Sequence, residues 1–424
     1  MTGTGFRFNL RSLVMNRLLA NICLLAIGFQ LTAPLTSAQT FKVLHIFKGK
    51  GDGRLPNGPL ARDATGNLYG TTNLGGRFPF GTVFKLSADG KKRILHSFEA
   101  VDGSFPEASV IRDSDGTLYG TTYEGGKAEG GKCEHGCGAV FALDKTGKEQ
   151  VLYAFTGGTD GSNPTAGLVR DTEGNLYGTT AAGGDLDCGG GCGTVFKIDP
   201  AGKETVLHSF AAGADGDYPL AGLIRDASGN LYGTTESGGS QNCEYNLGCG
   251  TVFKLDSAGV ETILYNFSAQ NDGIHPQSGL VRDDAGTLYG TTTQGGAYGF
   301  GTVFKLDSSG KETVLHSFTH GVDGATPMAG LIRDAQGNLY GTTYYGGDIS
   351  CFEDEGCGVV FELDTTGTLT VLHTFEGLDG SIPAASLTRD QAGNLYGVTT
   401  AGGDLVCSDN GEVPGCGVVF EITP

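Results

Sequence analysis

The sequence predicts an all-β protein, a seven-bladed β-propeller of four-stranded antiparallel blades. Three observations support this prediction: a motif that recurs seven times, four strand-like segments in each repeat, and a repeat divided between the two ends of the chain. Self-similarity at a fixed period is typical of repeat folds, in which each repeat forms one supersecondary unit. The period here is 50 to 58 residues, which accommodates four short strands and their turns.

The recurring motif is Leu-Tyr-Gly-Thr-Thr. It is complete in six copies, and the seventh carries an inserted Val398. An Arg-Asp pair precedes each copy, and a Gly-Gly pair and then Gly-x-Val-Phe follow it. The tyrosines that mark the copies are Tyr69, Tyr119, Tyr177, Tyr232, Tyr289, Tyr340 and Tyr396.

One repeat contains four segments rich in β-branched and aromatic residues, each bounded by turn residues, as expected of strands. In the fourth repeat they are Gly222–Arg225, Asn230–Thr235, Thr251–Leu255 and Glu261–Phe267. The turns Asp226–Gly229 and Asp256–Gly259 begin with Asp and end with Gly, which suits hairpins built on type I turns. The pattern therefore predicts a meander of four strands, and the turns explain much of the glycine content.

The two ends of the chain predict that the ring closes. The last repeat stops after its third strand, Val418–Ile422, and the missing fourth strand is found at Phe41–Phe47. An N-terminal strand that completes the last blade joins the ends, whereas an open solenoid would give no reason to divide a repeat. Closure removes exposed sheet edges.

The composition excludes several other classes of protein. Gly makes up 74 of 424 residues, but there is no G-X-Y period, and 23 Phe and 15 Tyr are too many core formers for a disordered chain. The formal charge of −19 argues against nucleic acid as a partner, because phosphate binding needs a cationic face.

Residues 1–38 have the layout of a secretory signal peptide, so we expect a single propeller domain over 39–424. Three Arg stand in a segment without acids, an apolar run from Leu18 to Phe29 follows, and small residues precede the expected cleavage after Ala38. The apolar run is too short to span a membrane, which needs roughly 20 residues. We therefore expect a secreted or periplasmic protein without a membrane span. Cleavage takes the charge from −19 to −22, because it removes three Arg and no acid.

Ten cysteines remain after the signal peptide, and all lie between the second and third strands of a repeat. We expect one disulfide within each of five loops, because repeats one and five lack both cysteines together and export supplies an oxidising compartment. A metal site is the alternative, although each pair offers only two of the four ligands that structural zinc requires. The expected pairs are Cys133/Cys137, Cys188/Cys192, Cys243/Cys249, Cys351/Cys357 and Cys407/Cys416.

The cysteine loops and the Asp-Gly-x-x-Pro connections between blades fall on one face of a propeller, and we expect function on this face, near the central channel. Residues that recur in every repeat, including the histidines of the fourth strands, are expected to fix blade geometry. Residues that break the repeat are the candidates for a single site. The position after each inter-blade Pro is occupied by Asn57, Glu107, Thr165, Leu220, Gln277, Met328 and Ala384.

Polar and aromatic residues among the variable positions suit a sugar or another polar ligand, although drift in exposed loops would give the same variation. Two further singletons, His275 and His320, lie in inter-blade loops. Catalytic residues stay unassigned, because the sequence contains none of the familiar nucleophile, metal or phosphate-loop motifs. The candidate ligand-binding residues are Asn57, Glu107, Tyr123, Glu124, Glu236, Gln277, Gln294, Tyr344 and Tyr345.

The motif Leu-Tyr-Gly-Thr-Thr-x-x-Gly-Gly followed by Gly-Thr-Val-Phe-Lys-Leu resembles the GloVer-type tandem repeat of exported bacterial proteins. This resemblance covers the chain from about Phe41 onward and implies export and repetition rather than a reaction. The segment Asp-x-x-Gly-Asn-Leu-Tyr is similar to NHL and gluconolactonase-type propellers, and the Gly-Gly pair is similar to kelch blades without their Trp. The lactonase resemblance implies a central metal, for which Glu107, Asn57 and Gln277 are the available side chains.

Three hypotheses of function follow. The first is a secreted, non-enzymatic, monomeric propeller that binds an extracellular polymer such as a glycan, or a cell-surface partner, through its disulfide-stapled loops. The second is a hydrolase, lactonase or lyase that uses carboxylates at the channel mouth, with Ca²⁺ as a possible cofactor. The third is a structural surface protein without a deep pocket. Some members of the resembled family end in a surface anchor, and the absence of one before Pro424 favours a soluble product.

Overall fold

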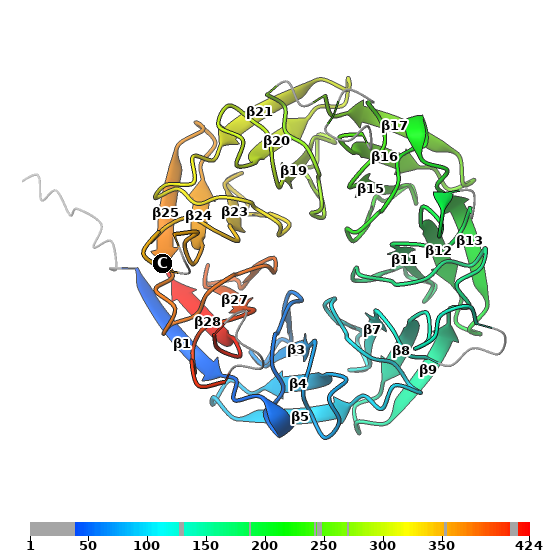
Figure 1. Cartoon of the computed structure of the whole chain (residues 1–424), viewed down its shortest axis with the longest axis horizontal. Helices are drawn as coiled ribbons and strands as arrows, with labels where there is room; N and C mark the ends of the chain where they lie inside the picture. Colours follow the sequence, from blue (N-terminus) through cyan, green and yellow to red (C-terminus); the bar gives the residue numbers. More distant parts are fainter. Residues whose placement is uncertain are drawn as a thin grey trace, which may run out of the picture. The chain divides into compact units, whose positions relative to one another are not determined.

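The computed structural model describes residues 39–126, 131–185, 188–240, 243, 248–268, 271–351, 354–407 and 414–424. The predicted signal peptide lies outside these residues. The described strands form seven four-stranded antiparallel sheets arranged as blades around a central axis, which confirms the predicted all-β propeller (Figure 1). Among the described residues, no helix has the length and hydropathy that a membrane span requires.

The strands have the same lengths in nearly every blade. The innermost strands are β2 (Ala61–Arg62), β6 (Ile111–Arg112), β10 (Val169–Arg170), β14 (Ile224–Arg225), β18 (Val281–Arg282), β22 (Ile332–Arg333) and β26 (Thr388–Arg389). The second strands are β3 (Leu68–Thr72), β7 (Leu118–Thr122), β11 (Leu176–Thr180), β15 (Leu231–Thr235), β19 (Leu288–Thr292), β23 (Leu339–Thr342) and β27 (Leu395–Thr399).

The third and fourth strands form the outer half of each blade. The third strands are β4 (Thr82–Leu86), β8 (Ala139–Leu143), β12 (Thr194–Ile198), β16 (Thr251–Leu255), β20 (Thr302–Leu306), β24 (Val359–Leu363) and β28 (Val418–Thr423). The fourth strands are β5 (Lys92–Ser97), β9 (Glu149–Ala154), β13 (Glu204–Ser209), β17 (Glu261–Asn266), β21 (Glu312–Ser317), β25 (Leu369–Thr374) and β1 (Thr40–Ile46). Short 3₁₀ turns occur at Lys50–Asp52 and Gly213–Asp215.

Blade 1 consists of β2 to β5, and blades 2 to 6 follow in order. Blade 7 is completed by the N-terminal strand, since its sheet runs β1-β28-β27-β26, as the divided repeat predicts. In Figure 1 the blue β1 lies beside the red β28 at the rim of the ring. The register pairs Thr40 with Thr423 and Val43 with Phe420, so the two ends of the chain share one sheet.

The structure corrects the prediction that Val398 is an insertion. Val398 pairs with Val419 and Thr399 with Val418, which is the register that the two motif threonines take in other blades. Val398 therefore replaces the first Thr of the motif. In blade 4 that threonine, Thr234, donates a hydrogen bond to the carbonyl of Ser278 in the next blade, and a valine cannot do so.

The glycine of the motif lies beneath an aromatic ring of the neighbouring strand. Gly233 pairs with Phe253, and a Cβ added to Gly233 would lie 2.6 Å from the Phe253 ring. The absence of a side chain lets the ring lie across the second strand. A second ring from the preceding blade then packs edge to face on this ring, with centroids 5.1 to 5.4 Å apart in each described pair. Edge-to-face Phe pairs thus join the blades without any Trp.

The repeated polar residues also join blades. In blade 4, Tyr232 donates its hydroxyl proton to Asp226, which lies in the turn before it, at 3.0 Å. The Arg282 guanidinium from blade 5 lies over the Tyr232 ring, 5.7 Å from its centroid. The same pair of contacts recurs around the ring, so the Arg-Asp and Tyr positions fix blade geometry as expected.

Candidate functional site

A tight corner brings each inter-blade connection to the central channel. The residue before each inter-blade Pro has a left-handed backbone with φ between 52° and 60°, which is costly for a residue other than glycine. Hydrogen bonds hold this corner: the Tyr218 amide donates to the Cys192 carbonyl at 3.1 Å, and the Tyr218 carbonyl accepts from Glu236 at 3.0 Å. The corner residues are Leu55, Phe105, Asn163, Tyr218, His275, Thr326 and Ile382.

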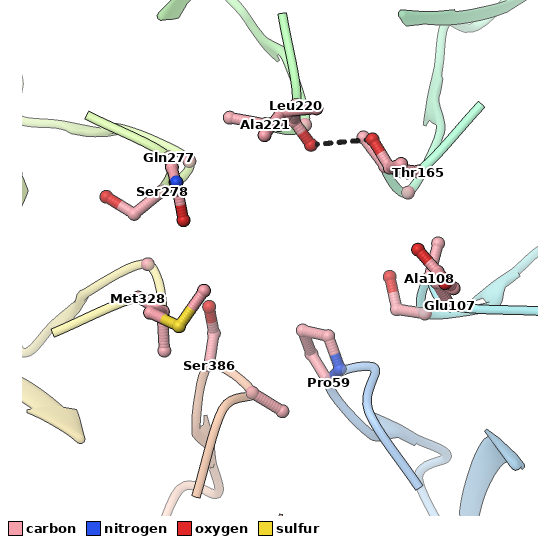
Figure 2. Close-up of a pocket in the computed structure, with 18 of the residues that line it drawn as sticks. Pro59, Glu107, Ala108, Thr165, Leu220, Ala221, Gln277, Ser278, Met328 and Ser386 are labelled. Atoms are coloured by element: carbon pink, nitrogen blue, oxygen red, sulfur yellow. Dashed lines mark hydrogen bonds between the residues drawn. The ribbon is translucent and has the colours of Figure 1, made fainter. Parts of the chain in front are cut away.

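The residues that follow the inter-blade prolines all line one central cavity of about 430 Å³. Asn57, Glu107 and Gln277 from the candidate list lie on its wall. Figure 2 shows Glu107 and Thr165 on one side of the cavity and Gln277 on the other. The Thr165 hydroxyl donates to the Leu220 carbonyl at 3.1 Å, so it is already paired.

Glu107 is the candidate acid that lines the central cavity. Burial raises the pKa of Glu107, the hydrogen bond from Asn73 opposes this shift, and the charge of Glu124 adds to it. The Asn73 amide lies 3.2 Å from Oε1 of Glu107. Burial also raises the pKa of Tyr123, with the charges of Glu107 and Glu124 adding to the effect. The structure therefore brings Glu107, Tyr123 and Glu124 together between blades 1 and 2.

A second polar group lies between blades 4 and 5. The Gln277 side-chain amide donates to Oε1 of Glu236 at 2.6 Å, and Nδ1 of His275 lies 3.2 Å from the Glu236 backbone carbonyl. Asp217 is buried, and burial together with the Glu236 charge raises the pKa of Asp217 to about 6. Oδ1 of Asp217 is enclosed without a hydrogen-bond partner. This group presents amide and carboxyl atoms that are incompletely paired.

The remaining candidates lie outside the central cavity, and two of them belong to an aromatic surface. Tyr344 and Tyr345 pack edge to face, 4.6 Å apart, and the charge of Glu355 adds to the burial that raises the pKa of Tyr345. Glu355 in turn lies 3.4 Å from His320, whose ring stacks on Phe300.

The aromatic surface extends to the cysteine-free loop of blade 5. Tyr298 is 61% exposed and Phe300 is 37% exposed. Gln294 is exposed, and its backbone pairs with Ile274. The loop of blade 5 therefore presents aromatic rings at the position where blades 2, 3, 4, 6 and 7 carry a disulfide.

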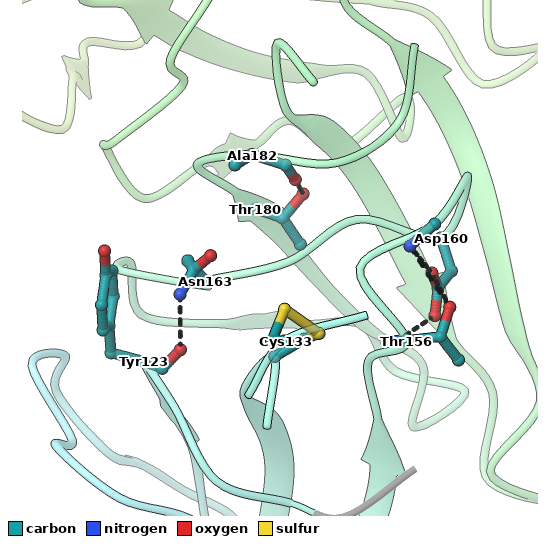
Figure 3. The surroundings of a disulfide bond; sticks show 9 residues. Tyr123, Cys133, Thr156, Asp160, Asn163, Thr180 and Ala182 are labelled. Atoms are coloured by element: carbon teal, nitrogen blue, oxygen red, sulfur yellow. Dashed lines mark hydrogen bonds between the residues drawn. A yellow bond between two sulfur atoms is a disulfide. The ribbon is translucent and has the colours of Figure 1, made fainter. Parts of the chain in front are cut away.

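The predicted disulfides are all present among the described residues, which confirms the pairing within loops. They join Cys133–Cys137, Cys188–Cys192, Cys243–Cys249, Cys351–Cys357 and Cys407–Cys416. Figure 3 shows the first disulfide, near which the Asn163 side chain donates to the Tyr123 carbonyl. The same loop lines a second cavity of about 590 Å³, together with Glu124, Phe105 and His135.

The side chains implied for a central metal do not fit a shared ion. Glu107 and Gln277 lie on opposite sides of the cavity, and each is engaged with a neighbour, Asn73 and Glu236 respectively. The candidate site is therefore a cavity with a mixed lining, in which Asn57, Glu107, Thr165 and Gln277 are polar side chains among small and apolar ones.

Sequence reasoning missed several residues of this site, namely Asp217, the corner residues Phe105 and Tyr218, and the exposed Tyr298 and Phe300. The residue before each inter-blade Pro varies from repeat to repeat, as the residue after it does. The criterion of sequence variation would therefore have selected the corner residues too. The aromatic loop of blade 5 was visible as the segment that replaces a cysteine pair. The burial of Asp217 depends on packing and left no sign in the sequence.

Comparisons with known proteins support the fold. The extracellular domain of a protein assigned as a one-component system from B. thetaiotaomicron aligns with a TM-score of 0.53 at 10% identity, covering 88% of this chain and 39% of that chain. A gluconolactonase from Xanthomonas campestris aligns at 18% identity over 73% of this chain and 82% of its own, with a TM-score of 0.41. A protein assigned as a 6-phosphogluconolactonase from Bacteroides uniformis shows 14% identity over 81% and 95%, with a TM-score of 0.47.

At 10% identity, the match with a TM-score of 0.53 supports the fold alone. A comparison with curated protein sequences gave no match. The model of the Gloeobacter/Verrucomicrobia repeat matches residues 29–191 and 188–413, which is most of the chain and spans the same repeats that form the blades. The chain belongs to the Gloeobacter/Verrucomicrobia repeat family.

Proposed function

We propose that this protein is an exported binding protein that holds a neutral glycan on the face that carries the cysteine loops. The observation that carries the proposal is the convergence of the variable residues that follow the inter-blade prolines on one cavity of about 430 Å³; the Cys133–Cys137 loop lines a second cavity. Cavities of this size accommodate small ligands, and a few convergent polar groups within them fix orientation.

The chemistry of the two cavities suits sugar hydroxyls. Gln277 and Asn57 offer amide groups and Glu107 a carboxyl group on the wall of the central cavity. Outside the cavities, Tyr298 and Phe300 are exposed in the cysteine-free loop of blade 5. The chain carries a formal charge of −19, which repels an acidic polymer at low salt and favours a neutral one. The five disulfides favour a protein that folds in an oxidising compartment, which supports export.

Isothermal titration with soluble oligosaccharides tests the proposal. Neutral cello-, xylo-, manno- and chito-oligosaccharides are compared with oligogalacturonate. Binding of a neutral oligosaccharide that weakens at least tenfold in Gln277→Ala and in Glu107→Gln supports the proposal. Lys91→Gln, an exposed residue of a hairpin turn, is the control and should bind as the unaltered protein does. Absence of binding to the whole neutral set, or equal loss in the control, contradicts it.

Export has its own test. The full chain is expressed in a bacterium, and the N-terminus of the protein recovered outside the cytoplasm is sequenced. A mature N-terminus at Gln39 supports export with cleavage after Ala38. Retention of the full chain in the cytoplasm contradicts it, whatever the binding experiment shows.

A second candidate function is a hydrolase, lactonase or lyase, and one observation favours it. Burial raises the pKa of Glu107, and Glu124 lies close enough for its charge to add to the shift. A buried carboxyl group with a raised pKa beside a second carboxyl group is typical of a general acid. Turnover of a lactone or glycoside, measured with and without Ca²⁺ and abolished in Glu107→Gln, would establish this function.

The cavities also count against a purely structural role, which predicts no deep pocket.

A further inference from the structure

Each contact between the outer strands of neighbouring blades, here called a seam, brings together three equivalent positions. An Asp from the inter-blade connection lies beside a His or Tyr of its own fourth strand, and a residue at the start of the next blade's fourth strand (the first residue, or the second in β1) faces them. In the seam between blades 7 and 1, these residues are Asp52, His45 and Lys92. The residues that occupy the third position around the ring are Lys92, Glu149, Glu204, Glu261, Glu312, Leu369 and Phe41.

Two seams place a His, an Asp and a Glu close enough to bind one ion. Between blades 3 and 4, Nε2 of His208 lies 3.2 Å from Oδ1 of Asp215 and 3.8 Å from Oε1 of Glu261. Between blades 1 and 2 the group is His96, Asp102 and Glu149, and in each group the three ligand atoms lie within 4.8 Å of one another. These are the groups of three or more His, Cys, Asp or Glu that the described residues bring within ligand distance.

One glutamate oxygen at each of these seams lacks a partner. Oε1 of Glu149 and Oε1 of Glu261 are enclosed by protein without a hydrogen bond, and so are Oε1 of Glu204 and of Glu312 at the two seams that carry a Tyr. A buried carboxylate that faces a second carboxylate requires a proton or a cation.

The seam between blades 7 and 1 carries a cationic side chain, Lys92, at the position that Glu149 and Glu261 occupy in the two His seams. The Lys92 ammonium lies 2.9 Å from Oδ1 of Asp52, beside His45, and its side chain is 5% exposed. Here the fold itself supplies a positive charge where the two His seams present a glutamate. Ring stacking also orients the candidate ligand His208, which packs edge to face on Phe210 at 4.7 Å.

We propose that the His96–Asp102–Glu149 and His208–Asp215–Glu261 groups are binding sites for a Zn²⁺-type divalent cation, each of which joins two neighbouring blades. One imidazole and two carboxylates leave a fourth position for water, which suits Zn²⁺. An imidazole ligand disfavours Ca²⁺ and Mg²⁺, which prefer oxygen ligands. The side chains of His208, Asp215 and Glu261 are 18%, 25% and 12% exposed, whereas Nε2 of His208 and Oε1 of Glu261 are themselves enclosed, so an ion there would be held away from bulk solvent.

The Tyr seams provide an internal contrast. Between blades 2 and 3, the Tyr153 hydroxyl donates to Asp160 at 3.0 Å, and Glu204 faces that pair. A phenol that donates its proton to the aspartate leaves no nitrogen ligand. The Glu204 and Glu312 seams are therefore matched sites that should not bind Zn²⁺.

Zinc binding by the tag-free protein tests the proposal, with isothermal titration and equilibrium dialysis at pH 7.5. We expect two ions per chain and a rise in melting temperature on binding. Glu149→Gln should bind one ion, and Glu149→Gln with Glu261→Gln should bind none. Glutamine keeps the size of the side chain, so the fold is retained, and circular dichroism checks this.

Two further variants separate the seams from other zinc-binding residues. Glu204→Gln alters the matched Tyr seam and should still bind two ions, whereas Tyr153→His should create a third site with Asp160 and Glu204. A protein that binds no Zn²⁺, or a double variant that still binds two ions, overturns the proposal. Loss of an ion in Glu204→Gln overturns it as well.

Discussion

Two aspartates of blade 4 show how the two faces of the ring differ. Asp226, in a hairpin turn, accepts hydrogen bonds from the Ser228 and Asn230 amides, from the Asn230 side chain and from Tyr232. Burial would raise the pKa of Asp226, but these bonds outweigh it and hold the pKa below its usual value. Asp217, on the face that carries the cysteine loops, has one enclosed oxygen without a partner, and its pKa is raised.

The difference separates residues that stabilise a turn from residues that break the repeat. Hairpin-face aspartates recur in every repeat and have their acceptor positions filled by their own turn. Among the repeat-breaking residues, Asn57, Glu107 and Gln277 line the central cavity, and Asp217 has an enclosed oxygen without a hydrogen-bond partner. The predictions below alter one side of this comparison and leave the other intact.

The largest effect is expected from Asp226→Ala. The substitution removes the acceptor of four hydrogen bonds, three of them half-buried, and we expect the free energy of unfolding to fall by about 3 kcal/mol. Denaturant unfolding measures this loss. Oligosaccharide binding at low temperature should be unchanged, because the turn lies on the opposite face. A loss under about 0.5 kcal/mol would show that water replaces these bonds at no cost.

Removal of one disulfide comes next. Cys188→Ala with Cys192→Ala opens a loop whose cysteines are separated by four positions, and the loop-closure entropy predicts a loss of about 2 kcal/mol. The melting temperatures of variant and parent are compared before and after reduction. After reduction, the melting temperatures of the variant and the parent should be equal, because neither then has the Cys188–Cys192 bond. A difference that persists in reductant would show that the alanine side chains themselves destabilise the protein.

A smaller, pH-dependent effect is expected from Glu204→Gln. Burial and then the Asp160 charge raise the pKa of Glu204 to about 7, from 4.5. A raised folded-state pKa stabilises the protein below the unfolded-state pKa, and this stabilisation is lost as the pH rises to about 7. The melting temperature of Glu204→Gln relative to the parent should therefore increase between pH 4.5 and 7 and then level off. A constant difference across this range would contradict the assigned pKa.

The smallest effect on stability is expected at Gln294, which is exposed on the face with the cysteine loops. Gln294→Ala should change the free energy of unfolding by less than about 0.5 kcal/mol. If Gln294 contacts the proposed glycan, titration should show weaker binding in this variant. Unchanged binding would restrict the site to the two cavities.

The blades could be predicted from the sequence because their determinants are local. An Asp-x-x-Gly turn and the strand on each side of it lie within a few residues, and the pattern occurs seven times. The closing strand was also predictable, since Phe41–Phe47 matches the fourth strand of other repeats. Val398 was misassigned because the sequence Gly-Val-Thr-Thr fits two explanations. Val398 could be inserted before the two threonines of the motif, or it could replace the first threonine, with Thr400 as the first loop residue. The strand register shows that it replaces the first threonine.

The site was less predictable because it depends on contacts between blades. Asn57, Glu107 and Gln277 line the cavity, but their partners Asn73 and Glu236 come from other loops or from the neighbouring blade. His96 and His208 were interpreted as packing residues, because identical strand positions give no sign of which side chain the next blade presents. The glutamates that face them become visible only when the blades are assembled.

The pairing of β1 with β28 also constrains the order of folding. Six blades form from contiguous segments and can assemble during synthesis, but β1 must wait for the last strand before it finds a partner. Joining segments so far apart in the chain carries the largest loop-closure entropy of any pairing in the sheets. We therefore expect refolding to show a fast phase from single blades and a slow phase from ring closure, and deleting β1 should remove the slow phase.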